Sequence, residues 1–146
     1  MSNHADSLTL RLARPEERGE LEELQRRASL ELPEYREELL ANPDAIYLPP
    51  AQVANGQVIV AEIDGKLVGF AAVVGGELDG LFVEPDLWGG GIGRVLVDAA
   101  THEARKRGLA LKVIANPRAR RFYEICGFSF EGEERTRFGP GLRMTK

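Results

Sequence analysis

A glycine-rich segment is the part of this sequence whose residue types and spacing best fit a binding function. Residues 83–97 read VEPDLWGGGIGRVLV, with Gly89, Gly90 and Gly91 in a row and Gly93 after one isoleucine. A glycine inside a helix costs about 0.5–1 kcal/mol relative to alanine, yet these glycines directly precede a stretch with helical periodicity. The first N–H groups of a helix have no helical partner and carry partial positive charge. Glycines there let an anion approach closely, so the segment predicts a phosphate site.

Two common phosphate-binding motifs do not fit this segment. A P-loop ends in Gly-Lys followed by Ser or Thr, whereas Gly93 is followed by Arg94 and Val95. A dinucleotide-binding turn has the pattern GxGxxG close to its strand. Here Leu96 stands in place of the last glycine, and residues 84–88 separate the strand from the glycines. A plain tight turn is the remaining alternative, although one or two glycines suffice for such a turn.

Apolar periodicity and turn signals indicate the elements that must position this loop. Strands are predicted at residues 8–12, 58–63, 66–74, 78–83, 109–114, 128–131 and 136–144. Helices are predicted to begin at Pro15, Pro33, Ile92 and Pro117. Residues 44–56 are expected to form a loop or a single helical turn, because Pro49 and Pro50 interrupt them.

The predicted order of elements is β-α-α-β-β-β-α-β-α-β-β. This order indicates an α/β (α+β) fold, with a mixed central sheet of about seven strands flanked by about four helices. The strand before the glycines and the strand after their helix form a βαβ unit, so they should be parallel neighbours. A chain of 146 residues fits a single domain spanning residues 1–146.

Composition narrows the class of protein. The net charge of −4 weighs against a nucleic-acid partner. No apolar run approaches the length of about 20 residues needed to span a bilayer, and the first residues do not resemble a signal peptide, so a cytoplasmic protein without a membrane partner is expected. The single cysteine, Cys126, excludes an internal disulfide. We expect it to be a packed thiol rather than a nucleophile, because its only histidine partners are His4 near the terminus and His102 on a helix.

Two motifs carry a resemblance to a known family. Leu81-Phe82-Val83-Glu84-Pro85, followed by the glycines and a helix, resembles motif A of the GNAT superfamily of acetyl-CoA-dependent N-acetyltransferases. The segment NPRARRFYEICGF, residues 116–128, resembles motif B of the same family. The two motifs stand in the family's order and separation, and the predicted elements match its fold, so the resemblance covers nearly the whole chain.

The resemblance implies a role for individual residues toward acetyl-CoA, and it implies no metal. The backbone of Leu81, Phe82 and Val83 is expected to pair with the pantetheine arm like an added strand, with one amide polarising the thioester carbonyl. Asn116 is expected to hydrogen-bond the pantetheine region, and Tyr123 to act as the general acid at the thioester sulfur. The amides that are expected to hold the pyrophosphate belong to Gly89, Gly90, Gly91, Ile92, Gly93 and Arg94. Trp88 also lies in this cofactor-binding stretch, at a position where the family usually has Gln or Arg.

The general base stays open between two carboxylates and a water relay. Strand alternation puts Glu77, Asp79, Leu81 and Val83 on one face. Glu77 stands where family members that acetylate histones carry a catalytic glutamate, whereas Leu111 stands where ribosomal-protein acetyltransferases have theirs. Asp79 is the competing candidate. A core-facing aromatic without chemistry is the alternative for Tyr123.

The acceptor is expected to be a primary amine of a small molecule or of a peptide N-terminus. Residues 1–60 carry eleven Asp or Glu against six Arg, which favours a cationic acceptor attracted by this charge. Members of the family are often homodimers, so a homodimer is one expected assembly. The competing hypothesis is a non-catalytic module that binds acyl-CoA or regulates another protein.

Overall fold

A seven-stranded sheet forms the centre of the structure, a computed structural model that describes residues 7–146. The strands are β1 (Leu8–Leu12), β2 (Val58–Ile63), β3 (Lys66–Val74), β4 (Glu77–Val83), β5 (Lys112–Ala115), β6 (Ser129–Thr136) and β7 (Gly139–Thr145). Their order in the sheet is β1-β2-β3-β4-β5-β7-β6. Among the strand pairs of residues 7–146, only β4–β5 is parallel, which confirms the predicted βαβ unit.

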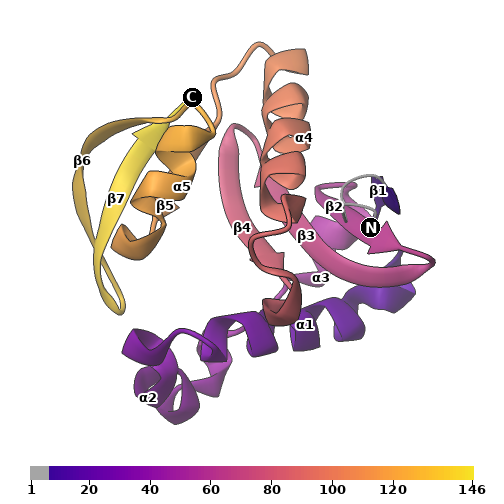
Figure 1. The fold of residues 1–146 in the computed structure, drawn as a ribbon, viewed down its shortest axis with the longest axis horizontal. Coiled ribbons are helices and arrows are strands. Elements are labelled where there is room, and N and C mark those ends of the chain that lie inside the picture. Colours follow the sequence, from indigo (N-terminus) through magenta and orange to yellow (C-terminus); the bar gives the residue numbers. More distant parts are fainter. Residues whose placement is uncertain (1–6) are drawn as a thin grey trace.

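Within residues 7–146, five α-helices flank the sheet, as Figure 1 illustrates. They are α1 (Arg18–Leu30), α2 (Pro33–Ala41), α3 (Pro50–Ala54), α4 (Ile92–Lys106) and α5 (Arg120–Ile125). Short 3₁₀ turns lie at η2 (Pro15–Glu17), η3 (Pro43–Ala45), η4 (Pro85–Leu87) and η5 (Pro117–Ala119). Each of these turns begins with proline, whose fixed φ suits a first helical position. The predicted fold class is confirmed, and α3 is the single turn expected within residues 44–56.

The two faces of the sheet bury separate hydrophobic clusters. On β2, Ile59 and Ala61 pack with α4, whereas Val58 and Val60 pack with α1. Successive side chains of a strand point to opposite faces, so an uninterrupted apolar run on β2 and β3 supplies both clusters. The sheet is therefore covered by α4 on one face and by α1 on the other.

The strand after α4 begins later than predicted. Residues 109–111 lie outside β5, because α4 ends in a Schellman motif: the Leu109 N–H donates to the Ala104 carbonyl at 2.9 Å and the Gly108 N–H to Arg105 at 3.0 Å. Gly108 has φ +72°, the left-handed conformation that such a cap requires.

The closing hairpin also differs from the prediction. Residues 132–135 are part of β6 rather than a turn, and the chain reverses between Thr136 and Gly139. β6 is an edge strand with mostly exposed, charged side chains. Charged residues of this kind protect a sheet edge from pairing with other chains, but they also resemble the composition of a loop.

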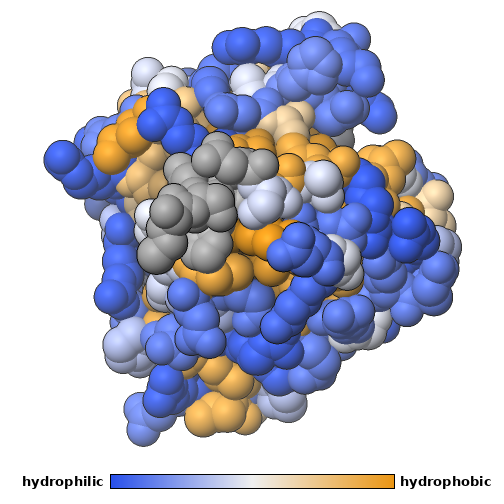
Figure 2. Space-filling model, turned by 45° about the vertical axis from the view of Figure 1, so that its right-hand side comes forward, coloured by the Kyte–Doolittle hydropathy of each residue, from blue (hydrophilic) through white to orange (hydrophobic). Residues whose placement is uncertain are grey.

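The face in Figure 2 is largely hydrophilic, with hydrophobic patches between charged side chains. Within residues 7–146, no helix combines the length and the apolar character that crossing a membrane requires.

A carboxylate near the start of the chain provides a test of the fold's electrostatics. Glu17 accepts hydrogen bonds from the Arg11 guanidinium at 2.9 and 2.6 Å and from the Arg14 N–H at 2.8 Å. The bonds to Arg11 lower the pKa of Glu17 to about 2. We expect Glu17→Gln to lower the free energy of unfolding at pH 7 by about 2 kcal/mol. Because the folded-state pKa lies below the unfolded one, the difference should be complete above about pH 4.5 and disappear as the pH falls through about 2.

Denaturant unfolding of both proteins at pH 7 and pH 2 measures this effect. Glu16→Gln is the matched control, because Glu16 is exposed and makes no hydrogen bond or ion pair within residues 7–146. It should change stability by less than about 0.5 kcal/mol. If Glu17→Gln lowered the free energy of unfolding equally at pH 7 and pH 2, the ionic origin of the effect would be contradicted.

Candidate active site

The glycine loop and the start of α4 expose a row of backbone N–H groups. Gly89 and Gly91 have φ +86° and +90°, a conformation that residues with a Cβ rarely adopt. The first helical bond of α4 runs from the Val95 N–H to the Gly91 carbonyl at 3.1 Å. The N–H groups of residues 92–94 therefore have no backbone partner within the described chain. These are N–H groups that the sequence predicts to hold an anion.

The edge of β4 that faces β5 is open. β4 and β5 pair only at Glu77 and Lys112, and the two strands diverge from there (Figure 1). The Glu84 N–H donates to the Val68 carbonyl at 2.9 Å, and hydrogen-bonded pairs alternate along an antiparallel ladder. The N–H and C=O of Val83 and Leu81 therefore point away from β3, toward the open edge. The backbone N–H and C=O of Phe82, which lies opposite Phe70, point to β3 instead. Of the three residues expected to pair with a cofactor, therefore, only Leu81 and Val83 direct backbone groups to the open edge.

One cavity of about 380 Å³ joins these two features. Its wall contains nine of the residues predicted to bind the cofactor: Leu81, Phe82, Val83, Trp88, Gly89, Gly91, Ile92, Gly93 and Arg94. Gly90 does not line the cavity; its N–H donates to the Leu87 carbonyl within the turn. We call this space the cofactor cavity.

The opposite wall of the cofactor cavity comes from residues that the motifs do not include. Ala28, Ser29 and Leu32, from α1 and the turn after it, face the glycine loop. Arg27 of α1 pairs with Glu84 after β4, which holds the helix over the strand end. The periodicity of α1 predicts its buried face, but nothing in it indicates which distant loop that helix meets.

A second cavity of about 310 Å³ lies beside the first and shares Ser29, Leu32 and Phe82 with it. Asn116 lines this second cavity rather than the cofactor cavity. Its Oδ1 accepts the Arg118 N–H at 2.9 Å and so caps the turn that precedes α5. Its side-chain NH₂ donates no hydrogen bond within residues 7–146.

A β-bulge at Asp79 corrects the predicted face of β4. Gly80 pairs with Ala72 and Leu78 with Val73, so Asp79 is an extra residue without a partner on β3. Such a bulge shifts the alternation by one residue. Leu78, Leu81 and Val83 consequently pack with the α4 cluster, while Phe82 packs with the α1 cluster. The expectation that Glu77, Asp79, Leu81 and Val83 share one face is therefore wrong.

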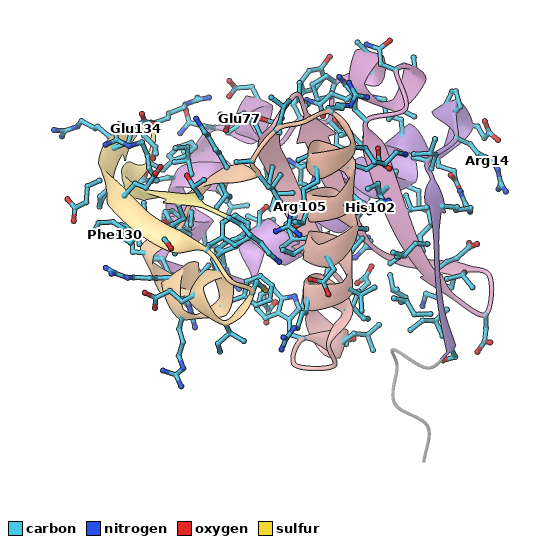
Figure 3. The ribbon with its side chains drawn as sticks, turned by 90° about the horizontal axis from the view of Figure 1, so that it is seen from above. Arg14, Glu77, His102, Arg105, Phe130 and Glu134 are labelled. Carbon is cyan, nitrogen blue, oxygen red and sulfur yellow. The ribbon has the colours of Figure 1, made fainter. Side chains whose placement is uncertain are left out.

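The two candidate bases lie on the other face of β4. Asp79 is exposed, and its Oδ2 accepts a hydrogen bond at 2.9 Å from Gln52 of α3, a helix packed on the α1 side. Glu77 is exposed at the beginning of β4 (Figure 3), at the position where β4 pairs with β5. Neither side chain lines either of the two cavities.

Tyr123 is a buried residue whose hydroxyl is not paired with protein. Its side chain is only 7% exposed and contacts the rings of Phe122 and Phe128 edge to face, with centroids 5.1 and 5.2 Å apart. The hydroxyl makes no hydrogen bond within residues 7–146, and no fully buried side-chain oxygen of that part of the chain lacks a partner. The oxygen must therefore reach accessible space. Burial raises the pKa of Tyr123 well above its ordinary value, so the phenol keeps its proton at neutral pH.

The remaining nucleophile candidates agree with their expected structural roles. Cys126 is buried, and burial raises the pKa of its thiol. His102 is exposed on α4, and Figure 3 shows it separated from Glu77. His4 lies outside the described residues. Among residues 7–146, no three His, Cys, Asp or Glu side chains are grouped as metal ligands.

Trp88 provides an optical test of the cofactor cavity, because it is the only tryptophan in the chain. Its indole Nε1 donates to the Val83 carbonyl at 2.8 Å, and the side chain is 47% exposed. A ligand that pairs with the backbone of Val83 must compete for this carbonyl. We expect coenzyme A to change the tryptophan emission in a saturable titration, and inorganic phosphate at the same concentrations to change it far less. An emission spectrum that coenzyme A leaves unaltered would contradict the placement of the cofactor at this edge.

Comparisons with known proteins agree with this geometry. The profile of the Acetyltransferase (GNAT) family matches residues 20–128. The chain is 38% identical over 101 residues to the peptidyl-lysine N-acetyltransferase YjaB of Escherichia coli, covering 68% of this chain and 63% of YjaB. It is 34% identical over 102 residues to the uncharacterized N-acetyltransferase MJ1207 of Methanocaldococcus jannaschii, covering 60% of this chain and 43% of that protein. The chain thus spans less than two thirds of the length of either relative.

Solved structures show the same fold. A GCN5-related N-acetyltransferase from Rhodopseudomonas palustris superposes with a TM-score of 0.79 at 28% identity, covering 96% of this chain and 95% of that one. The PaiA N-acetyltransferase of Thermoplasma acidophilum, solved in complex with coenzyme A, has a TM-score of 0.76 at 21% identity, covering 96% and 98%. With its split sheet, its glycine loop and both motifs, the chain belongs to the GNAT family of acetyltransferases.

Proposed function

We propose that this chain transfers the acetyl group of acetyl-CoA to a primary amine of a small molecule or of a peptide. The observation that carries the proposal is the cofactor cavity, where the free edge of β4 and the N-terminus of α4 meet. Membership of the GNAT family supports the proposal. The similarity to YjaB, a peptidyl-lysine N-acetyltransferase, supports a lysine side chain as one acceptor.

The residues present fit acetyl-CoA. The N–H groups of residues 92–94 suit a pyrophosphate, which favours a helix N-terminus. The N–H groups of Leu81 and Val83 and the C=O of Leu81 face the open edge and suit the two amides of the pantetheine arm, which can pair with a strand edge. The Val83 C=O, which accepts the Trp88 indole N–H, joins this pairing only when a ligand displaces the indole. Acetyl-CoA supplies the activated thioester. In this proposal the Leu81 N–H, which faces the open edge, donates to the carbonyl oxygen that gains charge during attack.

Tyr123 acts as the general acid in this proposal. Its protonated hydroxyl has no competing protein partner within residues 7–146, so it can donate to the departing thiolate. Phe122, the preceding residue, lines the cofactor cavity, which brings this part of α5 to the cofactor.

A base must remove the proton of the attacking amine, because alkyl amines are largely protonated at neutral pH. In this proposal Glu77, Asp79 or a water relay without a single base fills this role. Both carboxylates lie on the face of β4 that also carries Phe82, although neither lines either cavity. Bulges commonly re-aim side chains near active sites. Glu77→Gln and Asp79→Asn separate the candidates: the variant that loses the acid limb of the pH–rate profile identifies the base, and two unchanged profiles leave the water relay.

The proposal is tested by incubating the chain with acetyl-CoA and a panel of primary amines while free thiol is measured. Thiol release that depends on the amine supports transfer. Binding of coenzyme A without amine-dependent thiol release would instead support a non-catalytic acyl-CoA-binding module.

A further inference from the structure

The second cavity has a chemistry that bears on the acceptor. It adjoins the cofactor cavity through Phe82, so a molecule in it lies next to the position of the thioester. Helix α2 supplies Tyr35 and Leu39 on one side, and β5 and the β6–β7 hairpin supply Ile114 and Phe138 on the other.

No residue that lines this cavity within the described chain, residues 7–146, is charged. Its polar side chains are an amide on Gln25, another on Asn116 and the hydroxyls of Ser29, Tyr35 and Thr136. Burial raises the pKa of Tyr35, so that phenol is also neutral near pH 7. The cavity therefore offers apolar contacts and neutral hydrogen-bonding groups, but no carboxylate for a cation.

Two carboxylates near the cavity walls already have cationic partners. Arg118 pairs with Glu34 of α2 at 2.8 Å, and Arg137 of the hairpin pairs with Asp44 of η3 at 3.3 Å. The first pair joins α2 to η5, and the second joins η3 to the turn between β6 and β7. Glu34 and Asp44, two of the eleven carboxylates of residues 1–60, are thus neutralised by arginines from outside that segment, so the carboxylates nearest this cavity do not supply a free negative charge to attract a cationic acceptor.

We propose that the second cavity selects an acceptor whose reactive amine is carried on an apolar body, such as an aliphatic monoamine or the stem of a lysyl side chain. This inference rests on the proposed acetyl transfer. A second ammonium group in the cavity would be desolvated without a counter-charge, which is strongly unfavourable. An apolar body instead gains from burial against Leu39, Ile114 and Phe138.

A matched pair of amines tests the inference. Pentylamine and 1,5-diaminopentane have the same chain and differ by one terminal ammonium. We expect kcat/KM to be at least about tenfold higher for pentylamine, because a hydrophobic pocket rejects an unpaired charge. Nα-acetyl-lysine amide distinguishes a lysyl side chain from a free amine as the acceptor. A kcat/KM comparable to that of pentylamine favours a lysyl acceptor, and a much lower kcat/KM favours a free amine.

Three variants connect the preference to the cavity. Phe138→Ala should raise KM for pentylamine about tenfold and leave KM for acetyl-CoA unchanged. Gln25→Glu, nearly the same in shape, should shift the preference toward 1,5-diaminopentane about tenfold by supplying a carboxylate. Phe130→Ala is the control, because Phe130 lies on β6 outside both cavities (Figure 3) and should change neither KM.

Ligand-observed NMR in the presence of coenzyme A measures amine binding independently of turnover. Preferred binding and use of 1,5-diaminopentane, or equal use of both amines, would overturn the inference. If no amine releases thiol, acetyl transfer itself fails, and the NMR preference alone then decides whether the cavity selects apolar amines.

Discussion

Tyr123→Phe is expected to lower kcat about 100-fold, the usual range for loss of a general acid. KM for acetyl-CoA should change by less than about twofold, because the hydroxyl acts on the leaving group in the transition state. The substitution keeps both ring contacts and removes no protein hydrogen bond within residues 7–146, so stability should change by less than about 0.5 kcal/mol. Steady-state kinetics with thiol detection and thermal unfolding measure the two effects.

Tyr47→Phe is the matched control. Tyr47 is 55% exposed, and its ring lies under the Arg18 guanidinium at 5.3 Å, a contact that phenylalanine retains. This variant should keep the full rate. A Tyr123→Phe protein with unchanged kcat would exclude the acid role and leave Tyr123 as a core aromatic.

The pH dependence gives a second test of Tyr123. Since burial raises the pKa of this phenol above its ordinary value of about 10, it stays protonated at all lower pH values. The rate with wild-type protein should therefore rise as the amine and its base lose protons and should not fall before about pH 10. An alkaline fall with a midpoint near pH 8 would contradict proton donation by Tyr123.

Gly91→Asp is expected to weaken coenzyme A binding about 100-fold, equivalent to about 2.7 kcal/mol. Gly91 is the N-cap of α4, so a carboxylate there competes for the helix N–H groups and repels the pyrophosphate. Aspartate at φ +90° is strained like any residue with a Cβ, although it tolerates positive φ better than most, so stability should fall by no more than in the alanine variant described next. Titration calorimetry gives the affinity, and chemical denaturation gives the stability.

Gly91→Ala separates strain from charge. An alanine at φ +90° costs roughly 1–2 kcal/mol, but its Cβ would contact no atom within 4 Å. We therefore expect lower stability with less than about tenfold weaker binding. If alanine and aspartate weaken binding equally, the loop conformation rather than anion binding causes the loss.

Much of the fold follows from local patterns. The order of strands and helices can be read from apolar periodicity, and the prolines at residues 15, 33, 50 and 117 mark turns or helix starts that the structure contains. The glycine loop is predictable because a plain turn needs only one or two glycines, whereas this helix start has four. These signals lie within short stretches of sequence, where neighbouring residues determine the backbone.

Other features depend on pairing between distant segments. The bulge at Asp79 exists because β4 has one residue more than β3 between two paired positions, and neither strand alone reveals it. The second cavity combines residues from α1, α2, β4, β5 and the β6–β7 hairpin. Its uncharged lining cannot be read from the acidic composition of residues 1–60, because that count does not show which carboxylates form ion pairs.

In the proposed complex, coenzyme A occupies the free edge of β4 and the first turn of α4. An amide NMR titration of the ¹⁵N-labelled chain with coenzyme A detects this placement residue by residue. We predict large shifts for the amides of Leu81, Val83 and residues 92–94, with Phe82 moving less because its N–H is bonded to β3. Saturable binding that leaves these amides unshifted and perturbs another surface would contradict the account.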